Sequence, residues 1–145
     1  MAKDTFLINQ FERDVNTFID QIDDSLDDLI YNIGYGVEKA LIEVSPVDTG
    51  RFRANWQITE GAPATFAIND TDKEGKQTLQ REAGELRKIL NGGGAVRKLY
   101  FSNMLTYANA LEYGHSAQAP AGVIGVVEGR LGSIVSAAIQ KSKVK

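Results

Sequence analysis

The sequence has no cysteine, and its 145 residues include one histidine and three prolines. Without cysteine the chain has no disulfide bond, no thiol nucleophile and no cysteine-bound zinc or iron–sulfur site. A single histidine supplies too few nitrogen ligands for a typical metal site. Carboxylates could hold a hard cation, but the loop and glycine spacing of a calcium site is missing. The sequence therefore predicts no metal and no cofactor.

Long apolar runs are also missing. The best candidate, Val123 to Val127, is followed closely by Glu128 and Arg130, whereas a membrane-spanning helix needs about 20 apolar residues. The N-terminus has three consecutive apolar residues before Asn9, too few for the core of a signal peptide. We therefore expect a protein that does not enter a membrane and stays where it is made.

The overall composition is that of a folded protein. Hydrophobic residues make up 43% of the chain and charged residues 24%, which excludes disorder and low complexity as descriptions of the whole chain. A chain of this size buries roughly 70% of the surface that its unfolded form exposes. We therefore expect residues 1–145 to form a single domain with its own core.

Charge is distributed unevenly. Residues 1–45 hold ten acids and three bases, while the rest of the chain holds nine acids and thirteen bases. The simplest interpretation of the acidic segment is the solvated face of a helix. The alternatives are a surface that repels nucleic acid or a patch that binds a basic partner. The acids that we single out as a channel or partner face are Asp20, Asp23, Asp24, Asp27 and Asp28.

Apolar residues recur in steps of three and four from Phe11 to Val44, which predicts an amphipathic helix over residues 10–44 that Pro46 stops. Such a helix would be about 50 Å long, and a compact domain of this size is only about 40 Å across. The helix therefore either breaks, with Gly34 and Gly36 as the obvious place, or protrudes. A protruding helix would need a neighbouring subunit to cover its apolar stripe.

Residues 51–113 are expected to form the sheet region. The segments 54–59 and 65–69 are rich in β-branched and aromatic residues, and we predict that they pair as a hairpin. Residues 98–103 are predicted to form another strand. Residues 107–113 are predicted to form a further strand or one helical turn.

Two more segments have helical patterns. We interpret residues 73–94 as an insertion that forms either a short helix or a mobile loop. An apolar stripe within it ends at a run of glycines. Residues 122–141 are predicted to form a C-terminal helix. Four glycines would give it a smooth strip for close packing, most simply inside the domain: Gly122, Gly125, Gly129 and Gly132.

Signs of catalysis are weak. His115 follows Glu112, so a hydrolase that uses both residues is one alternative. A catalytic triad, however, needs a nucleophile on a strained elbow, and the sequence contains no Gly-x-Ser-x-Gly. The glycines at 92–94 lack the Gly-Lys-Ser/Thr ending of a phosphate-binding loop. We therefore expect no enzymatic activity.

A nucleic-acid-binding module is a second alternative. Its bases would have to share one face with neighbouring aromatic side chains, and the net charge of −3 is far from that of a dedicated binder. The residues that would carry such binding are Arg51, Arg53, Arg97 and Lys98.

Two motifs are more specific than any of these patterns. They are PVDTGRFRANW at residues 46–56, and YANALEYG at residues 107–114 with QAPAG at residues 118–122. In this order, after a long N-terminal helix, they resemble the neck proteins of long-tailed bacteriophages, the head–tail joining or tail-completion family. The resemblance covers roughly residues 10–140. It implies an α+β fold in which the N-terminal and C-terminal helices pack on a small antiparallel sheet. It also implies a ring of subunits in the neck of the virion, six by family analogy, and no enzymatic activity.

The resemblance also implies a function and partners. The chain would be a structural virion protein, made in the bacterial cytoplasm, that joins the DNA-filled head to the tail. Its neighbours would be other neck proteins, the connector and the tail terminator, and genomic DNA would only pass through the ring. The alternative is a tail terminator, a ring protein that ends growth of the tail tube.

The first motif has the chemistry of a rigid turn. Pro46 fixes its own φ, Asp48 or Thr49 can bond the backbone amides that follow, and Gly50 can adopt a positive φ. Alternation along residues 51–56 would place two arginines and an asparagine on one face and apolar residues on the core face. The motif could also serve the fold alone.

The polar face of this segment could meet a partner. Glu112 lies among apolar residues, and we expect it to pair with an arginine of its own or of a neighbouring subunit. The candidate interface residues are Asp48, Arg51, Arg53, Trp56, Glu112, Tyr113 and Arg97.

Overall fold

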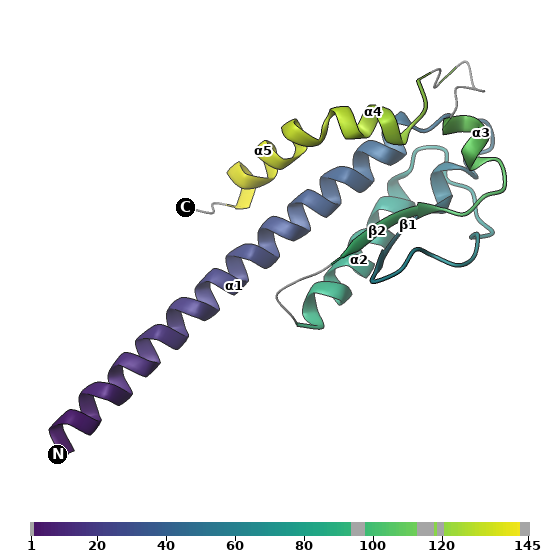
Figure 1. Cartoon of the computed structure of the whole chain (residues 1–145). Coiled ribbons are helices and arrows are strands. Elements are labelled where there is room, and N and C mark those ends of the chain that lie inside the picture. Colours follow the sequence, from purple (N-terminus) through teal and green to yellow (C-terminus); the bar gives the residue numbers. More distant parts are fainter. Residues whose placement is uncertain (1, 94–97, 113–117, 119–120, 143–145) are drawn as a thin grey trace.

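The computed structural model describes residues 2–93, 98–112, 118 and 121–142 (Figure 1). Within them the helices and a small two-stranded antiparallel sheet form an α+β fold, as predicted. The elements are α1 (Ala2–Val44), the 3₁₀ helix η1 (Arg53–Asn55), β1 (Trp56–Glu60), α2 (Lys76–Asn91), β2 (Leu99–Asn103), α3 (Ala108–Glu112), α4 (Ile124–Gly129) and α5 (Leu131–Ser142). None of the helices in this described part is long and apolar enough to cross a membrane.

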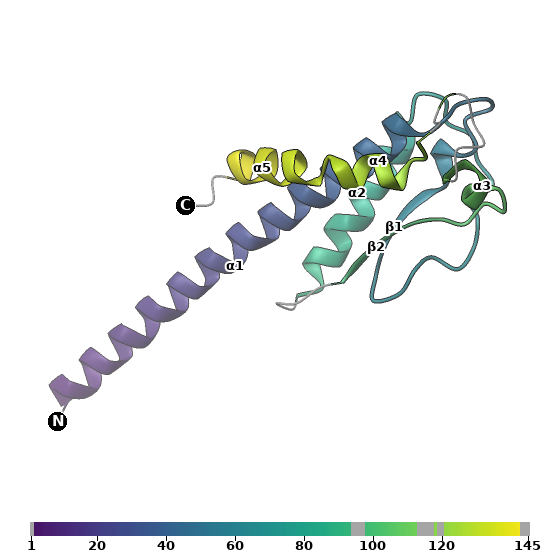
Figure 2. The same cartoon turned by 45° about the horizontal axis from the view of Figure 1, so that its top comes forward.

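Helix α1 is continuous over 43 residues, which corresponds to a length of about 65 Å. Its C-terminal half lies against the rest of the molecule, and its N-terminal half extends away from it (Figures 1 and 2). The part of α1 that packs against the rest of the molecule begins near Tyr31 and Asn32. The guanidinium carbon of Arg87 in α2 lies 4.0 Å from the ring centroid of Tyr31, and Asn32 Nδ2 donates to Ser142 Oγ of α5 at 2.8 Å.

Of the two predicted alternatives, the helix protrudes and does not break at Gly34 and Gly36, and the structure gives both glycines another role. A Cβ atom at position 34 would lie 2.7 Å from Leu86 Cδ2 in α2. A Cβ atom at position 36 would lie 2.9 Å from Ile134 Cγ2 in α5. The two glycines therefore let α2 and α5 approach α1 closely, and this packing offsets their poor helix propensity.

The sheet pairs β1 with β2, so the predicted hairpin between residues 54–59 and 65–69 is wrong. The register places Trp56 opposite Asn103 and Glu60 opposite Leu99. Residues 65–69 form no strand. They run beside η1 and β1, where the side chains of Asn55 and Gln57 bond their backbone. Asn55 Nδ2 donates to the carbonyl of Ile68 at 3.0 Å, and the amide of Ile68 donates to Asn55 Oδ1 at 2.6 Å.

Helix α2 lies along the edge of β1 that does not pair with β2. Of the two alternatives predicted for the insertion at residues 73–94, a short helix or a mobile loop, the structure has the helix. Glu82 Oε1 accepts the amide hydrogen of Ile58 at 2.7 Å. Arg81 Nη2 donates to the carbonyls of Ala54 and Trp56 at 3.0 and 3.2 Å. The two side chains also bond each other, with Arg81 Nε 2.7 Å from Glu82 Oε2. They therefore satisfy backbone groups that a third strand would otherwise bond.

The predicted C-terminal helix is two helices. Helix α4 ends at Gly129, and α5 begins at Leu131. Between them, the amide of Arg130 donates to the carbonyl of Val127 at 2.9 Å. Both helices pack mainly along α1 rather than on the sheet (Figure 1). Between α1, the sheet and α4 lies the main core: Ala40, Leu41, Ile42, Phe52, Trp56, Leu105, Val123 and Val127.

A carboxyl group is buried between α1 and α2. The side chain of Glu38 has no exposed surface, and neither of its oxygens has a hydrogen-bond partner among the described residues. Burial, reinforced by the neighbouring charge of Glu82 and only partly countered by Arg81, raises the pKa of Glu38 to about 8. The fold therefore keeps this carboxyl protonated at neutral pH.

The substitution Glu38→Gln should change how stability depends on pH. Between the ordinary pKa of 4.5 and the folded value of about 8, the folded protein binds more protons than the unfolded one, so stability falls as pH rises. Glutamine cannot ionise. We expect the variant to unfold with a free energy higher than wild type by a few kcal/mol at pH 9, and with little difference near pH 4.5, because a tenfold change in proton affinity corresponds to about 1.4 kcal/mol.

Urea denaturation across this pH range measures the effect. Glu43→Gln is the matched control, because Glu43 lies on the same helix and is exposed. A pH profile of Glu38→Gln parallel to that of wild type would contradict the prediction.

Candidate functional site

The two sequence motifs meet at one corner of the molecule, beside α3. The side chain of Gln118 joins them: its Nε2 donates to the carbonyl of Val47, and the amide of Val47 donates to its Oε1, both at 2.9 Å. The rings of Phe52 and Tyr107 lie 6.2 Å apart. We call this region the motif corner. It encloses a hollow of about 280 Å³ lined by Pro46, Val47, Asp48, Thr49, Gly50, Arg51, Phe52, Tyr107, Leu111 and Gln118.

The turn of the motif corner has the geometry that its residues predict. Gly50 has a φ of +88°, and a Cβ atom there would lie 2.5 Å from the backbone nitrogen of Lys73. Of the two candidate capping residues, Thr49 accepts the amide hydrogen of Arg51 through its Oγ1 at 3.2 Å. The carbonyl of Gly50 accepts the amides of Ala54 and Asp72, both at 3.0 Å. The glycine therefore allows the loop before α2 to pack directly on the turn.

Arg53 was predicted to face a partner, but its guanidinium bonds the chain's own backbone. Nε and Nη2 donate to the carbonyls of Ser45 and Glu43 at the end of α1, both at 3.2 Å, and Nη1 donates to the carbonyl of Lys73 at 2.9 Å. The last carbonyls of a helix lack partners within it, and they carry negative partial charge. Arg53 is therefore a cap that ties the end of α1 to the loop before α2.

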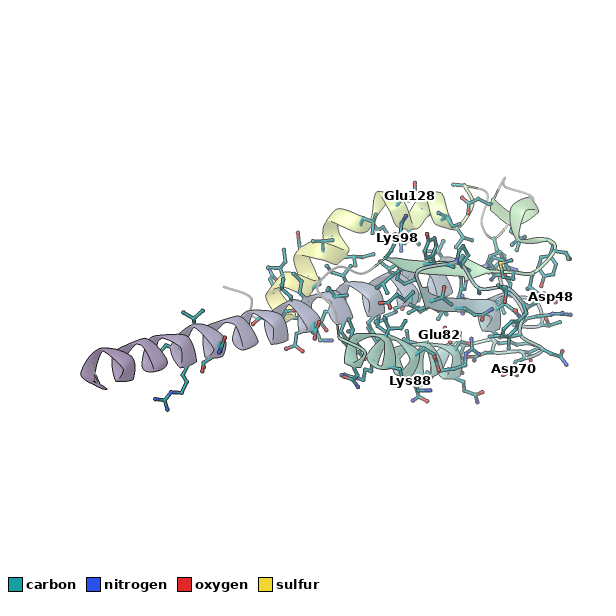
Figure 3. All side chains as sticks on the ribbon, turned by 60° about the horizontal axis from the view of Figure 1, so that its bottom comes forward. Asp48, Asp70, Glu82, Lys88, Lys98 and Glu128 are labelled. Carbon is teal, nitrogen blue, oxygen red and sulfur yellow. The ribbon has the colours of Figure 1, made fainter. Side chains whose placement is uncertain are left out.

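The predicted alternation along residues 51–56 is also wrong because residues 53–55 form a 3₁₀ helix instead of a strand. Asn55, expected on the polar face with the arginines, is fully buried and bonds residues 51 and 68. Trp56 is buried too, and its Nε1 donates to Ser45 Oγ at 2.8 Å. Of the candidate interface residues in this motif, Asp48 and Arg51 remain exposed (Figure 3 labels Asp48).

Glu112 caps a helix, and its described partners do not include the arginine that we expected. Its Oε1 accepts the amides of Val123 and Ile124 at 2.9 and 2.6 Å, and its Oε2 accepts the amide of Gly125 at 3.0 Å. Partial burial opposes ionisation, but these three bonds outweigh it and lower the pKa of Glu112. The negative charge lies at the positive end of α4, where it stabilises the start of that helix.

The four glycines of the C-terminal segment have different neighbours. Gly122 has a φ of +81°, and a Cβ atom there would overlap the carbonyl oxygen of Glu112. A Cβ atom at Gly125 would lie 3.6 Å from Glu112 Oε2, in ordinary contact. Among the described atoms, nothing lies within 4 Å of such a Cβ at Gly129 or Gly132. Of these four positions, close packing of the described atoms therefore requires a glycine only at Gly122.

Part of the predicted acidic face lies within the described side chains. Asp28 is exposed and Asp27 is partly buried, both on α1 near the point where it leaves the body. For Asp20, Asp23 and Asp24 the backbone is helical, but their side chains lie outside the described ones. Arg97, Tyr113 and His115 lie outside the described residues altogether.

The sequence analysis missed several polar residues that hold this region together. Asp72 Oδ1 accepts the amide of Gly75, and its Oδ2 accepts the amide and hydroxyl hydrogens of Thr78, at 2.8 to 2.9 Å. Burial opposes ionisation, yet these bonds lower the pKa of Asp72. An aspartate just before a helical stripe is a capping signal that the sequence does carry. The pair Arg81 and Glu82 has no such signal, because buried and solvated polar residues of a helix look alike in sequence.

The chemistry that the motif corner offers is recognition. In the described part of the chain, no three histidine, aspartate or glutamate side chains are placed to hold a metal ion. The carboxylates of Glu112 and Asp72 are already occupied by backbone amides. What remains at the surface is a rigid hollow with an exposed acid, Asp48, and an exposed base, Arg51. Such a surface suits a protein partner.

The substitution Gly50→Ala should destabilise the fold much more than Gly61→Ala. Both glycines have a positive φ, +88° and +81°, so alanine at either position should cost about 1 kcal/mol in backbone strain. A methyl group at position 61 meets nothing within 4 Å among the described atoms, whereas at position 50 it meets backbone at 2.5 to 2.8 Å. We expect a total loss of about 3 kcal/mol or more for Gly50→Ala in urea denaturation. Equal losses for the two variants would contradict this account of the turn.

Compared with known proteins, the chain matches no family model, no curated protein and no solved structure. The functional interpretation therefore rests on the motif corner and on the helix that leaves the body.

Proposed function

We propose that the chain is a structural protein of the bacteriophage virion neck, made in the host cytoplasm, which forms a ring and joins the DNA-filled head to the tail. The observation that carries this proposal is the N-terminal half of α1, which extends from the body (Figure 1). Val15 and Leu26, which both lie before the contact of α1 with the body at Tyr31, are 38% and 44% exposed. An apolar stripe left in water on a long helix is typical of a surface that another chain covers. Assembly is therefore the function that the geometry supports best.

The motif corner supports the same proposal from the other end of the molecule. Asp48 and Arg51 stand on a turn that Gly50, Thr49 and the Gln118 bridge hold rigid. Rigid placement of opposite charges favours one orientation of a partner over others. In a neck, the partners would be the connector, other neck proteins and the tail terminator.

The charge of the protruding helix suits a passage for DNA. Residues 1–28 hold eight acids and two bases. A negative wall repels phosphates and keeps DNA from adhering as it moves. Stable binding of nucleic acid is less well supported, because the guanidinium of Arg53 is occupied by three backbone carbonyls. Genomic DNA would therefore only pass through the ring.

The proposal is tested by electron microscopy of lysates from a phage genome with an early stop codon in this gene, complemented in parallel by the intact gene. We expect DNA-filled heads beside separate tails of normal length, because the joining ring would be missing. Overlong tails would identify a tail terminator instead. Intact infectious particles without complementation would overturn the proposal of a neck protein.

The channel role of the acidic helix has its own test. Reversal of four acids, Asp23→Lys, Asp24→Lys, Asp27→Lys and Asp28→Lys, should lower the yield of infectious phage by an order of magnitude or more, because attracted phosphates would hinder DNA passage. Plaque counts and DNA ejection assays measure the loss. The matched control replaces the same four residues by asparagine, which removes the negative charge without attracting DNA. Full infectivity of the lysine variant would exclude a channel role for this face.

A further inference from the structure

A second and larger hollow lies on the side of α1 that faces β2 and α4. It has a volume of about 530 Å³. Its walls come from the middle of α1, including Val37, from β2, including Tyr100, and from the C-terminal helices, including Ile124, Glu128 and Leu131. We call it the apolar groove.

The lining of the apolar groove fits a hydrophobic side-chain surface better than a small polar molecule. Sites for small molecules carry several polar groups that converge on the ligand and fix its orientation. Here the polar side chains are the carboxylate of Glu128 and the hydroxyl of Tyr100. At the rim, Ile124 and Leu131 are 44% and 40% exposed. The groove therefore leaves apolar surface in water that an apolar occupant would cover.

The protruding half of α1 carries such a surface. Val15, Leu26 and Val37 are spaced eleven residues apart, which is close to three helical turns, so they lie on nearly the same side of the helix. Val37 lines the apolar groove, while Val15 and Leu26 lie outside the body and are exposed. The wall of the groove and the uncovered stripe are thus parts of one continuous apolar face.

One chain cannot bring these two surfaces together. The stripe and the groove wall belong to the same unbroken helix, which holds them apart along its axis. We propose that the apolar groove of each subunit receives the uncovered α1 stripe, from Val15 to Leu26, of a second copy of this chain. Each subunit then donates one stripe and offers one groove, so the contact is head-to-tail and a closed set of such contacts is a ring.

Charge complementarity supports the second copy as the occupant. The donated helix holds eight acids and two bases in residues 1–28, whereas the remainder of the chain holds fourteen bases and eleven acids. At the mouth of the groove, Lys98 extends over the ring of Tyr100, with its Nζ 6.0 Å from the ring centroid, and Arg130 is exposed next to the groove residue Leu131. The lining itself holds one acid, Glu128 (Figure 3 labels Lys98 and Glu128). Opposite charges around an apolar centre orient a partner and speed its association.

Cysteine cross-linking tests the contact, because the natural chain has no cysteine and introduced thiols are the only ones. The double variant Leu26→Cys with Leu131→Cys places one thiol on the stripe and one at the groove rim, both at exposed positions. Within one subunit these positions are too far apart to bond. Ile134 of α5 meets α1 at Gly36, which is ten residues, or about 15 Å, from Leu26, and Leu131 lies farther along.

Under mild oxidation we expect a ladder of disulfide-linked dimers and higher species from the full-length protein. The matched control, Leu26→Cys with Phe66→Cys, carries its second thiol at a position that is 66% exposed and outside the apolar groove. It should give no ladder. Absence of the ladder, or an equal ladder in the control, would overturn the proposal.

Complementation provides a second test in analytical ultracentrifugation. A stripe variant carries Val15→Asp and Leu26→Asp, and a groove variant carries Ile124→Asp and Leu131→Asp, all at exposed positions. Each should sediment as a monomer where wild type assembles. An equal mixture should form a heterodimer and nothing larger, because one intact stripe meets one intact groove. Circular dichroism checks that both variants are folded. A monomeric wild type at all concentrations, or unchanged assembly of both variants, would overturn the contact.

The inference deepens the proposed ring, but the two can fail separately. If the protein forms the ladder and the heterodimers but phage without it stay infectious, the contact is supported and the neck function is rejected. If the stop codon leaves separate heads and tails but cross-linking detects no contact between stripe and groove, the neck function is supported and the subunits meet through another surface.

Discussion

The end of α1 is the point on which the rest of the structure depends. The last carbonyls of this helix are bonded by Arg53, and the hydroxyl of Ser45 is bonded by Trp56, so the residues that follow the helix also terminate it. The same guanidinium reaches the carbonyl of Lys73, and the carbonyl of Gly50 accepts the amide of Asp72. The carbonyls at the end of a helix lack partners within the helix. Here the bonds that satisfy them also fix the turn, the start of β1 and the approach to α2.

A small sheet can be stable here because helices complete it. Two strands alone are marginal in water, and β1 gains its missing partners from Arg81 and Glu82 of α2. Burial between α1 and α2 raises the pKa of Glu38, and the charge of Glu82, which this arrangement brings near, adds to the rise, so the buried carboxyl stays neutral. The close approach of α2 and α5 to α1 at Gly34 and Gly36 then buries the apolar side chains between them. The result is a rigid body from which half of α1 extends.

The body and the extended helix have different physical roles. The body fixes the motif corner at one end and the apolar groove along α1. The extended helix supplies acidic charge and an uncovered apolar stripe. A lone subunit leaves this apolar surface in water, so the proposed assembly follows from the shape of the chain as much as from its motifs.

The sequence by itself determined the local features. Periodicity of three and four predicts α1 and the helix of the 73–94 insertion, and the chemistry of Gly50 predicts its positive φ, because these signals involve residues close in the chain. Tertiary structure alone decided that β1 pairs with residues 99–103, that Arg53 and Glu112 cap helices, and that Gly34 and Gly36 admit neighbours instead of breaking α1. At the candidate site the sequence therefore predicted the turn correctly. It assigned Arg53 to a partner and Glu112 to an arginine, whereas both side chains bond backbone groups of the chain itself. The physical reason is that a polar side chain is drawn to whichever unsatisfied backbone group the fold brings near it, and its position in the sequence does not encode that neighbour.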